Sequence, residues 1–370
     1  MSSHLTLLTA KQTLKALHEN PSQYAFIDVR SEGEFEEGGF PRFQNIPLLN
    51  NQERHLVGLE YKQRGREMAI ELGHQLVDPD QNSRISKWKD AITLSEKKEG
   101  IFCCWRGGLR SKISAQWARE AGEKVQQVQG GYKALRREIL SVFEDPPDLL
   151  ILAGWTGSGK TKLLHQLKTP LLDIEKLAKH RGSCFGQEIT QNGYAIQPRQ
   201  QSFENLLGLG LYDRTKTYLL EDESTRIGSL HIPVQLKAKM KISPVILLTA
   251  NVETRARHIF EEYIQEPTQN GVAPLQVQEH FIKNLEFLHR KMGGLAYQDL
   301  KDKMLRAFQS GFGFREHEEW ISELLTKHYD PSYEHALKRN NRPVVFEGDF
   351  KACAEWITQN CNSSSACIPK

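Results

Sequence analysis

The 370-residue chain is poor in cysteine and has no long hydrophobic run. Its six cysteines include no C-x-x-C pair, which argues against a disulfide framework and against a cysteine-based metal site. The thirteen histidines are scattered, and no group of His, Cys and Asp has metal-ligand spacing, so the sequence predicts no metal centre. The longest apolar runs, such as residues 149–153, are far shorter than the roughly 20 residues that cross a bilayer.

The first 15 residues contain no continuous hydrophobic stretch of the kind found in secretory signals. We therefore expect a cytoplasmic protein that has no membrane partner. Cys361 and Cys367 lie in a C-terminal segment rich in Ser and Asn, and we expect both to be exposed thiols without a role.

The net charge of +3 is small but unevenly distributed. Residues 101–141 hold eight Lys and Arg against three Asp and Glu, and residues 151–200 hold seven against three. This basic excess favours an anionic substrate and is compatible with nucleic acid; a solvated basic face without a partner is the alternative.

Short apolar segments alternate with helical patterns along the chain, which predicts a parallel α/β sheet. Buried strands are expected at 25–30, 100–104, 125–128, 149–153, 218–221 and 244–249. The acidic, proline-containing stretch 144–148 is the clearest linker. We therefore predict two α/β domains, 1–145 and 146–370, the second with a helical C-terminal region in which residues 272–303 are broken at Gly293 and Gly294.

A first Gly-rich loop follows the strand 100–104 and begins with a cysteine. Cys104 is placed to be a nucleophile or a carrier of sulfur or selenium, because backbone N–H groups and a helix N-terminus stabilise a thiolate. The rest of the loop forms the predicted anion cradle: Arg106, Gly107, Gly108 and Arg110. Cys103 should point the opposite way, toward the core. A structural cysteine in an ordinary strand-to-helix turn is the alternative for Cys104.

A second loop, between the strand 149–153 and a helix, matches G-x-x-x-x-G-K-[ST] in full. Its backbone N–H groups can wrap a di- or triphosphate, while Lys160 reaches the terminal phosphates and the Thr161 hydroxyl can bind Mg²⁺. The predicted phosphate-binding residues are Gly154, Gly157, Ser158, Gly159, Lys160 and Thr161. Such a loop need not hydrolyse a nucleotide, because it can also hold a diphosphate that acts as a leaving group.

Three further groups are candidates for this second site. Glu221, Asp222 and Glu223, at the end of a strand, are candidate acidic partners, although a solvated acidic turn is as good an explanation. Arg255 and Arg257 are candidates for a phosphate clamp, with surface ion pairing as the alternative. Residues 180–183 form a polar, turn-rich segment that either contacts the bound ligand or is a plain surface loop.

The N-terminal part resembles a rhodanese domain in Ile27-Asp-Val-Arg-Ser31, Glu34-Phe35, Gly38-Gly-Phe-Pro41, Asn45-Ile-Pro47 and the cysteine loop. The succession of Cys104-Trp-Arg-Gly-Gly-Leu-Arg-Ser111, Gln129-Gly-Gly-Tyr-Lys133 and the P-loop resembles the bacterial tRNA 2-selenouridine synthase family. The resemblance extends over nearly the whole chain, and further matching stretches are residues 61–63, 172–173, 180–183, 185–186, 203–205 and 221–224.

This resemblance implies a rhodanese-like parallel-sheet domain followed by a P-loop NTPase-like α/β domain. It also implies an enzyme that acts on the wobble 2-thiouridine of certain tRNAs. Geranyl diphosphate would alkylate the sulfur, and selenophosphate would then supply selenium in place of the geranylthio group. Cys104 would be the essential cysteine that bears selenium, and the P-loop would hold the diphosphate of the geranyl donor.

The resemblance implies tRNA, through its anticodon loop, as the partner, with a selenophosphate-producing enzyme as a second candidate. No tightly bound cofactor is expected; selenophosphate and geranyl diphosphate are co-substrates, and a need for Mg²⁺ stays open. Three other functions remain alternatives at this stage: a rhodanese-fold cysteine phosphatase, a P-loop small-molecule kinase, and a regulatory module with an inert N-terminal half.

Overall fold

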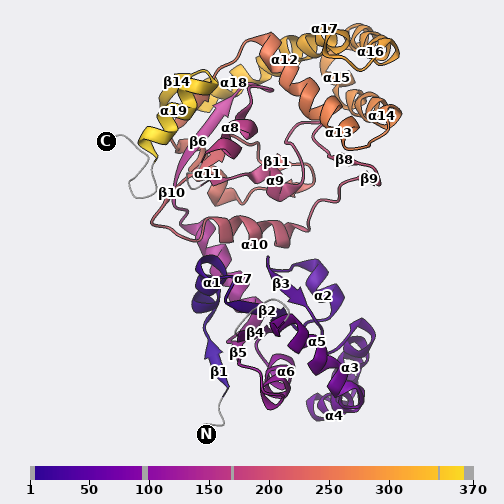
Figure 1. Ribbon diagram of the computed structural model, residues 1–370, viewed down its shortest axis with the longest axis vertical. Coiled ribbons are helices and arrows are strands. Elements are labelled where there is room, and N and C mark those ends of the chain that lie inside the picture. The colour runs from indigo at the N-terminus through magenta and orange to yellow at the C-terminus, as the bar shows by residue number, and fades with distance from the viewer. Residues whose placement is uncertain (1–4, 94–98, 168–170, 341, 362–370) are drawn as a thin grey trace. The chain divides into compact units, whose positions relative to one another are not determined.

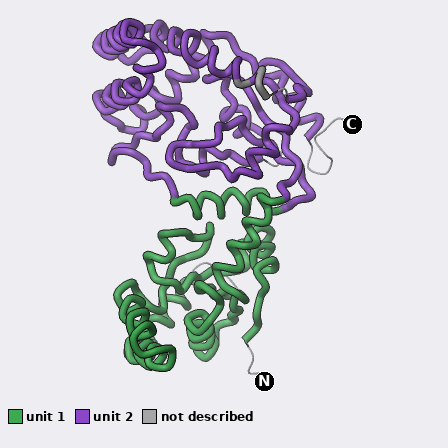
Figure 2. Tube along the Cα trace, turned by 180° about the vertical axis from the view of Figure 1, so that it is seen from behind, with its two compact units in different colours: residues 1–144, 199–212 green, residues 145–198, 213–370 purple. Residues whose placement is uncertain are grey.

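The computed structural model describes residues 5–93, 99–167, 171–340 and 342–361. The chain divides into two compact units, with residues 1–144 and 199–212 in unit 1 and residues 145–198 and 213–370 in unit 2 (Figure 2). Within the described ranges, none of the helices combines the length and the apolar character that a membrane span requires.

Unit 1 is built on a five-stranded parallel sheet in the order β1-β5-β4-β2-β3 (Figure 1). Its strands are β1 Thr6–Leu8, β2 Tyr24–Asp28, β3 Phe43–Asn45, β4 Glu99–Cys103 and β5 Val125–Val128. The helices before the linker are α1 Ala10–Glu19, α2 Glu32–Glu37, α3 Asn51–Arg64, α4 Arg66–Val77, η1 Asp78–Asp80, α5 Gln81–Thr93, α6 Leu109–Glu120 and α7 Gly131–Glu144. This unit confirms the predicted parallel α/β sheet.

A later segment returns to unit 1, which we did not expect from the sequence. Helix α10, Gln200–Gly210, packs on α7 and buries Phe203 and Leu207 completely. Asn205 accepts a hydrogen bond from Arg136 of α7 at 3.0 Å. Unit 1 is therefore not the continuous stretch 1–145, because α10 covers an apolar face of α7 that those residues alone leave open.

Unit 2 contains a second five-stranded parallel sheet, in the order β14-β13-β6-β10-β7. Its strands are β6 Asp148–Gly154, β7 Leu171–Leu172, β10 Thr217–Glu221, β13 Val245–Leu248 and β14 Val344–Gly348. The helices that accompany this sheet are α8 Lys160–Gln166, α9 Ile174–Ala178, α11 Val234–Ile242, α12 Val252–Phe260 and α19 Phe350–Asn360. Two short hairpins join them: β8 Ile189–Thr190 with β9 Gly193–Tyr194, and β11 Arg226–Ile227 with β12 Leu230–His231.

One cysteine of the C-terminal segment is buried rather than exposed. Cys361 closes α19 with 1% of its surface accessible and packs in the same hydrophobic cluster as Leu150, Ile246 and Cys353. The prediction of an exposed thiol was wrong here, because α19 carries the chain back onto the sheet. Cys367 lies outside the described residues.

The predicted helical region follows α12 and has its own core. It comprises η2 Glu261–Gln265, α13 Glu266–Gln269, α14 Pro274–Leu285, η3 Glu286–Leu288, α15 His289–Met292, α16 Gly294–Ser310, α17 Phe314–Leu324, η4 Leu325–Tyr329 and α18 Asp330–Asn340. Phe281, Met304 and Trp320 lie in its hydrophobic cluster. The predicted break is confirmed at Gly293, whose φ of 82° ends α15. Segments η2 and η4 are π-helical turns, which are rare and frequently occur at functional sites.

Candidate active sites

The cysteine loop of unit 1 lies between β4 and α6, at the carboxyl end of a central strand. Cys104 follows the last residue of β4, and Gly108 caps α6. The Cys104 Sγ lies 3.1 Å from the Ser111 Oγ, which in turn accepts a hydrogen bond of 2.8 Å from the Gln127 side chain. The thiol therefore has a polar partner on the first turn of the helix that follows it.

Close backbone contacts hold this loop against the turn that begins α7. The Cys104 carbonyl accepts a hydrogen bond from the Tyr132 N–H at 2.8 Å. Gly107 and Gly131 have positive φ values of 63° and 58°. A Cβ atom on Gly131 would lie 2.1 Å from the Cys104 carbonyl oxygen. The Gln129-Gly-Gly-Tyr-Lys133 motif thus supplies the glycine that lets the cysteine loop approach so closely.

Cys104 itself is 3% exposed and contacts the hydrophobic cluster of unit 1. The Cys104 thiol is therefore buried, and it does not lie open to solvent at the surface of the predicted anion cradle. Cys103, on the other side of the strand, is also buried, as predicted. Burial, followed by the charge of Asp28, raises the pKa of the Cys103 thiol well above its usual range, so this neighbour stays protonated.

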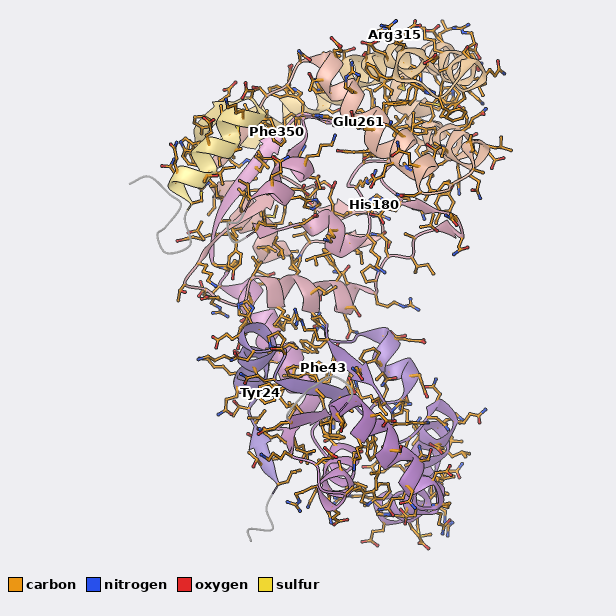
Figure 3. All side chains as sticks on the ribbon, viewed as in Figure 1. Tyr24, Phe43, His180, Glu261, Arg315 and Phe350 are labelled. Carbon is orange, nitrogen blue, oxygen red and sulfur yellow. The ribbon has the colours of Figure 1, made fainter. Side chains whose placement is uncertain are left out.

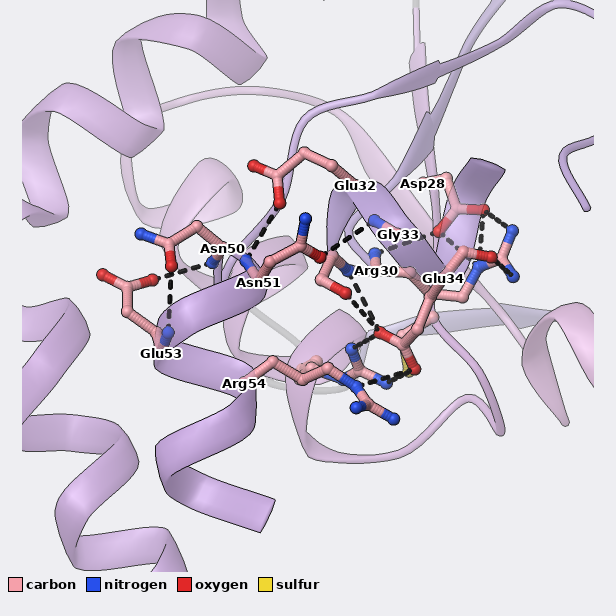
Figure 4. Close-up of polar contacts among 12 residues, drawn as sticks. Asp28, Arg30, Glu32, Gly33, Glu34, Asn50, Asn51, Glu53 and Arg54 are labelled. Carbon is pink, nitrogen blue, oxygen red and sulfur yellow. Dashed lines mark hydrogen bonds and ion pairs between the residues drawn. The ribbon is translucent and has the colours of Figure 1, made fainter. Parts of the chain in front are cut away.

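The charges around the loop are partly neutralised by acidic partners. Arg110 donates to both carboxylate oxygens of Glu34, one of them at 3.0 Å, and Arg54 lies 3.5 Å from the same carboxylate. Figure 4 shows Glu34 reaching Arg54 and, beside it, the buried Asp28–Arg30 pair. Arg106 is exposed. The predicted cradle thus contains one solvent-facing cation and one that is already paired.

The phosphate-binding loop of unit 2 has the predicted strand-to-helix setting between β6 and α8. Gly157 and Gly159 adopt positive φ values of 79° and 90°. The Lys160 ammonium donates to the Gly154 carbonyl at 2.9 Å, across the mouth of the loop. Ser158 is buried, and its hydroxyl has no hydrogen-bond partner. All six predicted residues lie in this one turn and can present several N–H groups to a phosphate.

Glu221 is brought to this loop, as proposed for an acidic partner. Its Oε1 accepts a hydrogen bond from the Thr161 hydroxyl at 2.8 Å, and its Oε2 is buried without a partner. Asp222 lines the pocket in front of this loop, but its carboxylate is held in an ion pair with Arg342, with one donor–acceptor distance of 3.0 Å.

Glu223, one of the predicted candidates, and Glu175, which the sequence did not single out, join Glu221 in a cluster. Oxygens of Glu175, Glu221 and Glu223 lie within 4.8 Å of one another. Burial, followed by the charge of Glu223, raises the pKa of Glu175 to about 10 and that of Glu221 to about 8. Spacing could not predict the place of Glu175, because it comes from α9, whereas Glu221 ends β10 and Glu223 follows it.

The two arginines predicted as a phosphate clamp have other partners. Arg255 is buried and donates to Asp330 at 3.0 Å and to the Thr156 carbonyl at 2.9 Å. Arg257 pairs with Glu253 at 3.3 Å and lies over the ring of Phe314. Arg255 is therefore neither a phosphate clamp nor a surface ion pair, because it is buried and braces the P-loop through the Thr156 carbonyl, whereas Arg257 forms the surface ion pair stated as the alternative.

A pocket of about 760 Å³ lies in front of the P-loop. Arg181, Gly182 and Ser183 line it, so the segment 180–183 reaches the site rather than lying apart on the surface. Glu261, labelled in Figure 3, accepts a hydrogen bond from Lys162 at 2.6 Å on the same wall. The π-helical turns contribute Tyr263 and Tyr329, so aromatic rings face a phosphate cradle across one cavity.

A strand-end cysteine loop in one parallel-sheet unit and a P-loop in another define the class: a rhodanese-like domain joined to a P-loop domain. Comparison with known families agrees. Residues 9–138 match the rhodanese-like domain, and residues 147–364 match the tRNA 2-selenouridine synthase AAA domain.

The chain belongs to the tRNA 2-selenouridine synthase family. It is 38% identical over 348 residues to the tRNA 2-selenouridine synthase of Marinobacter nauticus, covering 89% of this chain and 93% of that protein. It is 37% identical over 349 residues to the synthase of Shewanella oneidensis, covering 90% and 91%. The synthase of Psychromonas ingrahamii is also 37% identical over 349 residues, covering 90% and 93%.

Proposed function

We propose that this protein converts the wobble 2-thiouridine of tRNA to 2-selenouridine in two steps. In the first, the sulfur is alkylated by geranyl diphosphate, and diphosphate leaves. In the second, the selenium of selenophosphate attacks C2: a C2–Se bond forms, the C2–S bond breaks and geranylthiol leaves, and water hydrolyses the Se–P bond to release phosphate. The observation that carries the proposal is that both motif loops are folded at strand ends in a chain related over its length to enzymes of this name.

The P-loop pocket supports the first step. The loop amides and Lys160 suit a diphosphate, and stabilising the charge on a leaving diphosphate lowers the barrier to geranyl transfer. A narrow apolar crevice adjoins the same pocket and shares Ile259, Tyr263 and Tyr329 with it. Phe281 and Trp320 also line this crevice, whose volume is about 20 Å³, so it offers an apolar wall beside the phosphate site but does not enclose a geranyl chain.

The carboxylate cluster fits a divalent cation in this step. Glu221 has a buried oxygen without a partner, and acidic side chains crowd the wall where a diphosphate would lie. Glu175, Glu221, Glu223 and the Thr161 hydroxyl are the oxygen ligands that Mg²⁺ prefers. When bound there, Mg²⁺ would offset the charge of the diphosphate. Lys160 and the loop amides would position the donor from the other side.

The cysteine loop supports the second step. We assign Cys104 as the residue on which selenium transfer depends and Arg106 as the exposed cation nearest to it in sequence. We give Cys103 no part in the reaction, because its side chain is buried in the core and burial raises the pKa of its thiol well above the usual range. Arg110 acts through Glu34, whose position it fixes beside the loop.

The test is mass spectrometry of nucleosides from tRNA incubated with the enzyme, geranyl diphosphate and selenophosphate. Cys104→Ala should abolish 2-selenouridine and leave S-geranyl-2-thiouridine in place, whereas Cys103→Ala should retain both products. If Cys104→Ala makes selenouridine at the normal rate, the assignment is wrong.

The P-loop assignment is tested in the same assay by Lys160→Ala. Both products should decline together, because geranylation comes first, and use of geranyl diphosphate should weaken by about 10- to 100-fold, as expected for one lost charge-assisted contact. The matched control is Lys179→Ala, since Lys179 follows α9 and does not line the pocket. Equal activity of both variants would contradict the assignment.

A further inference from the structure

Trp105, the residue after Cys104, exposes a large aromatic ring beside the cysteine loop. Its accessible fraction is 38%, although most rings in this unit are buried. The ring stacks on Tyr132, with centroids 5.4 Å apart and planes inclined by 20°. Tyr132 is buried, and the Arg30 guanidinium also lies over the indole, 5.8 Å from its centre, yet part of Trp105 remains open to solvent.

The support under this ring is rigid. The Arg30 guanidinium lies 3.9 Å from the centre of the Tyr132 ring and is itself completely buried, held by Asp28 at 2.7 Å. The Trp105 carbonyl accepts a hydrogen bond from the Lys133 N–H at 3.0 Å. The indole is therefore fixed relative to Cys104 before any ligand arrives, which lowers the entropic cost of binding.

Cations adjoin the exposed ring. Arg106 follows it in the chain, and Lys133 is joined to it through the backbone hydrogen bond; both side chains are exposed. An open aromatic face flanked by cations is how proteins bind unpaired nucleotides, with the base stacked on the ring and the phosphates near the cations. The Tyr132 ring, stacked nearly parallel to the indole, suits a flat ligand such as a nucleobase better than the aliphatic side chains of a protein partner.

We propose that Trp105 is a stacking platform for an unpaired nucleobase of the substrate RNA, with Arg106 and Lys133 contacting the flanking phosphates. This inference rests on the proposed function and adds to it a positioning residue. The base held on Trp105 would lie beside the cysteine loop, so that its C2 position is presented where selenium transfer occurs.

The experiment compares Trp105→Ala, Trp105→Phe and Leu109→Ala in the full chain, using an anticodon stem-loop RNA that carries S-geranyl-2-thiouridine and free selenophosphate. Leu109 is the matched control, because it is 42% exposed at the start of α6 and cannot stack. Trp105→Ala should raise KM for the RNA at least about fivefold with a smaller change in kcat, since a stacked base contributes about 1–3 kcal/mol. Trp105→Phe should recover most of the affinity, and Leu109→Ala should behave as wild type.

The outcomes separate this inference from the function on which it rests. If the wild-type enzyme forms no selenouridine, the proposed function fails, whatever the variants do. If wild type is active but Trp105→Ala has an unchanged KM, or Leu109→Ala is equally impaired, the platform is overturned. If Trp105→Ala is impaired only when a selenophosphate-producing enzyme replaces free selenophosphate, Trp105 is a protein-docking residue and the platform is likewise overturned.

Discussion

At the scale of single residues, Glu34 is the acid that organises the charges near the cysteine loop. It accepts from Arg110 and lies near Arg54. Burial alone would raise its pKa, but the bond and charge of Arg110, helped by Ser31 and Arg54, hold the pKa at about 2, below the ordinary value of 4.5. The ionised carboxylate therefore stabilises the folded unit.

This shift predicts an acid-dependent loss of stability. A depressed carboxylate pKa gives stability that is present above about pH 4.5 and is lost as the pH falls toward 2. The full shift corresponds to roughly 3 kcal/mol, and solvent screening of this partly exposed group reduces it to about 1–2 kcal/mol. Urea unfolding at pH 7 and pH 3 should show Glu34→Gln losing less stability on acidification than wild type. An identical pH dependence in both proteins would refute this.

Arg255 shows that the ion-pair partner of a residue cannot be predicted from the sequence around it. An arginine on a helix after a P-loop strand is a reasonable phosphate ligand, yet its partner Asp330 lies 75 residues away along the chain. No local pattern links the two, because the pairing depends on how α18 is placed. The same applies to Glu175, which joins Glu221 and Glu223 only through the fold.

At the scale of elements, the contact between the cysteine loop and the turn before α7 is a very tight backbone approach within unit 1. Gly131 has no room for a Cβ atom, since the Cys104 carbonyl and the Gly107 nitrogen would lie 2.1 and 2.4 Å away. Both glycine-containing segments must therefore keep their conformations for the cysteine to keep its position.

Gly131→Ala should consequently destabilise the protein by several kcal/mol or displace the loop. Gly122→Ala is the matched control, because Gly122 also has a positive φ, 93°, but a Cβ atom added there would meet nothing within 4 Å. The Gly122→Ala substitution should lower the free energy of unfolding only by the backbone strain, about 1–2 kcal/mol. Denaturant unfolding of the two variants measures the difference; equal losses would mean that the close contact is unimportant.

The strands and loops were predictable where short patterns determine them. Buried apolar runs predicted all six expected strands, and the two Gly-rich motifs lie at the strand-to-helix turns that their chemistry requires. Helix α10 escaped prediction as part of unit 1, since an amphipathic pattern shows that a face is buried but not what covers it. The burial of Cys361 was missed for the same reason.

At the scale of the whole molecule, the basic excess of residues 101–141 becomes a surface property of unit 1. Arg106, Lys112, Lys133 and Arg137 are all exposed. Phosphate contacts release counterions, so RNA affinity should fall steeply as salt is added.

Replacing these four cations by Gln should lower the slope of log K against log salt by about 3 in magnitude, given about 0.7–0.9 for each phosphate contact. Binding of the cognate tRNA across a KCl series measures the slope. The control is the same number of substitutions at exposed lysines elsewhere in the two units, Lys11, Lys15, Lys241 and Lys351. If both sets of substitutions lowered the slope equally, the RNA would not bind preferentially to the cations of residues 101–141, and the prediction would be wrong.

The return of residues 199–212 to unit 1 has a practical consequence for anyone dissecting this enzyme. The polypeptide enters unit 2, leaves it for one helix and enters it again. After proteolytic cleavage in the proline linker, the N-terminal and C-terminal fragments should remain associated. The reason is that α10 belongs to the C-terminal fragment but packs on α7 of the N-terminal fragment. Genetic complementation by two separately expressed pieces is accordingly a more natural experiment than truncation.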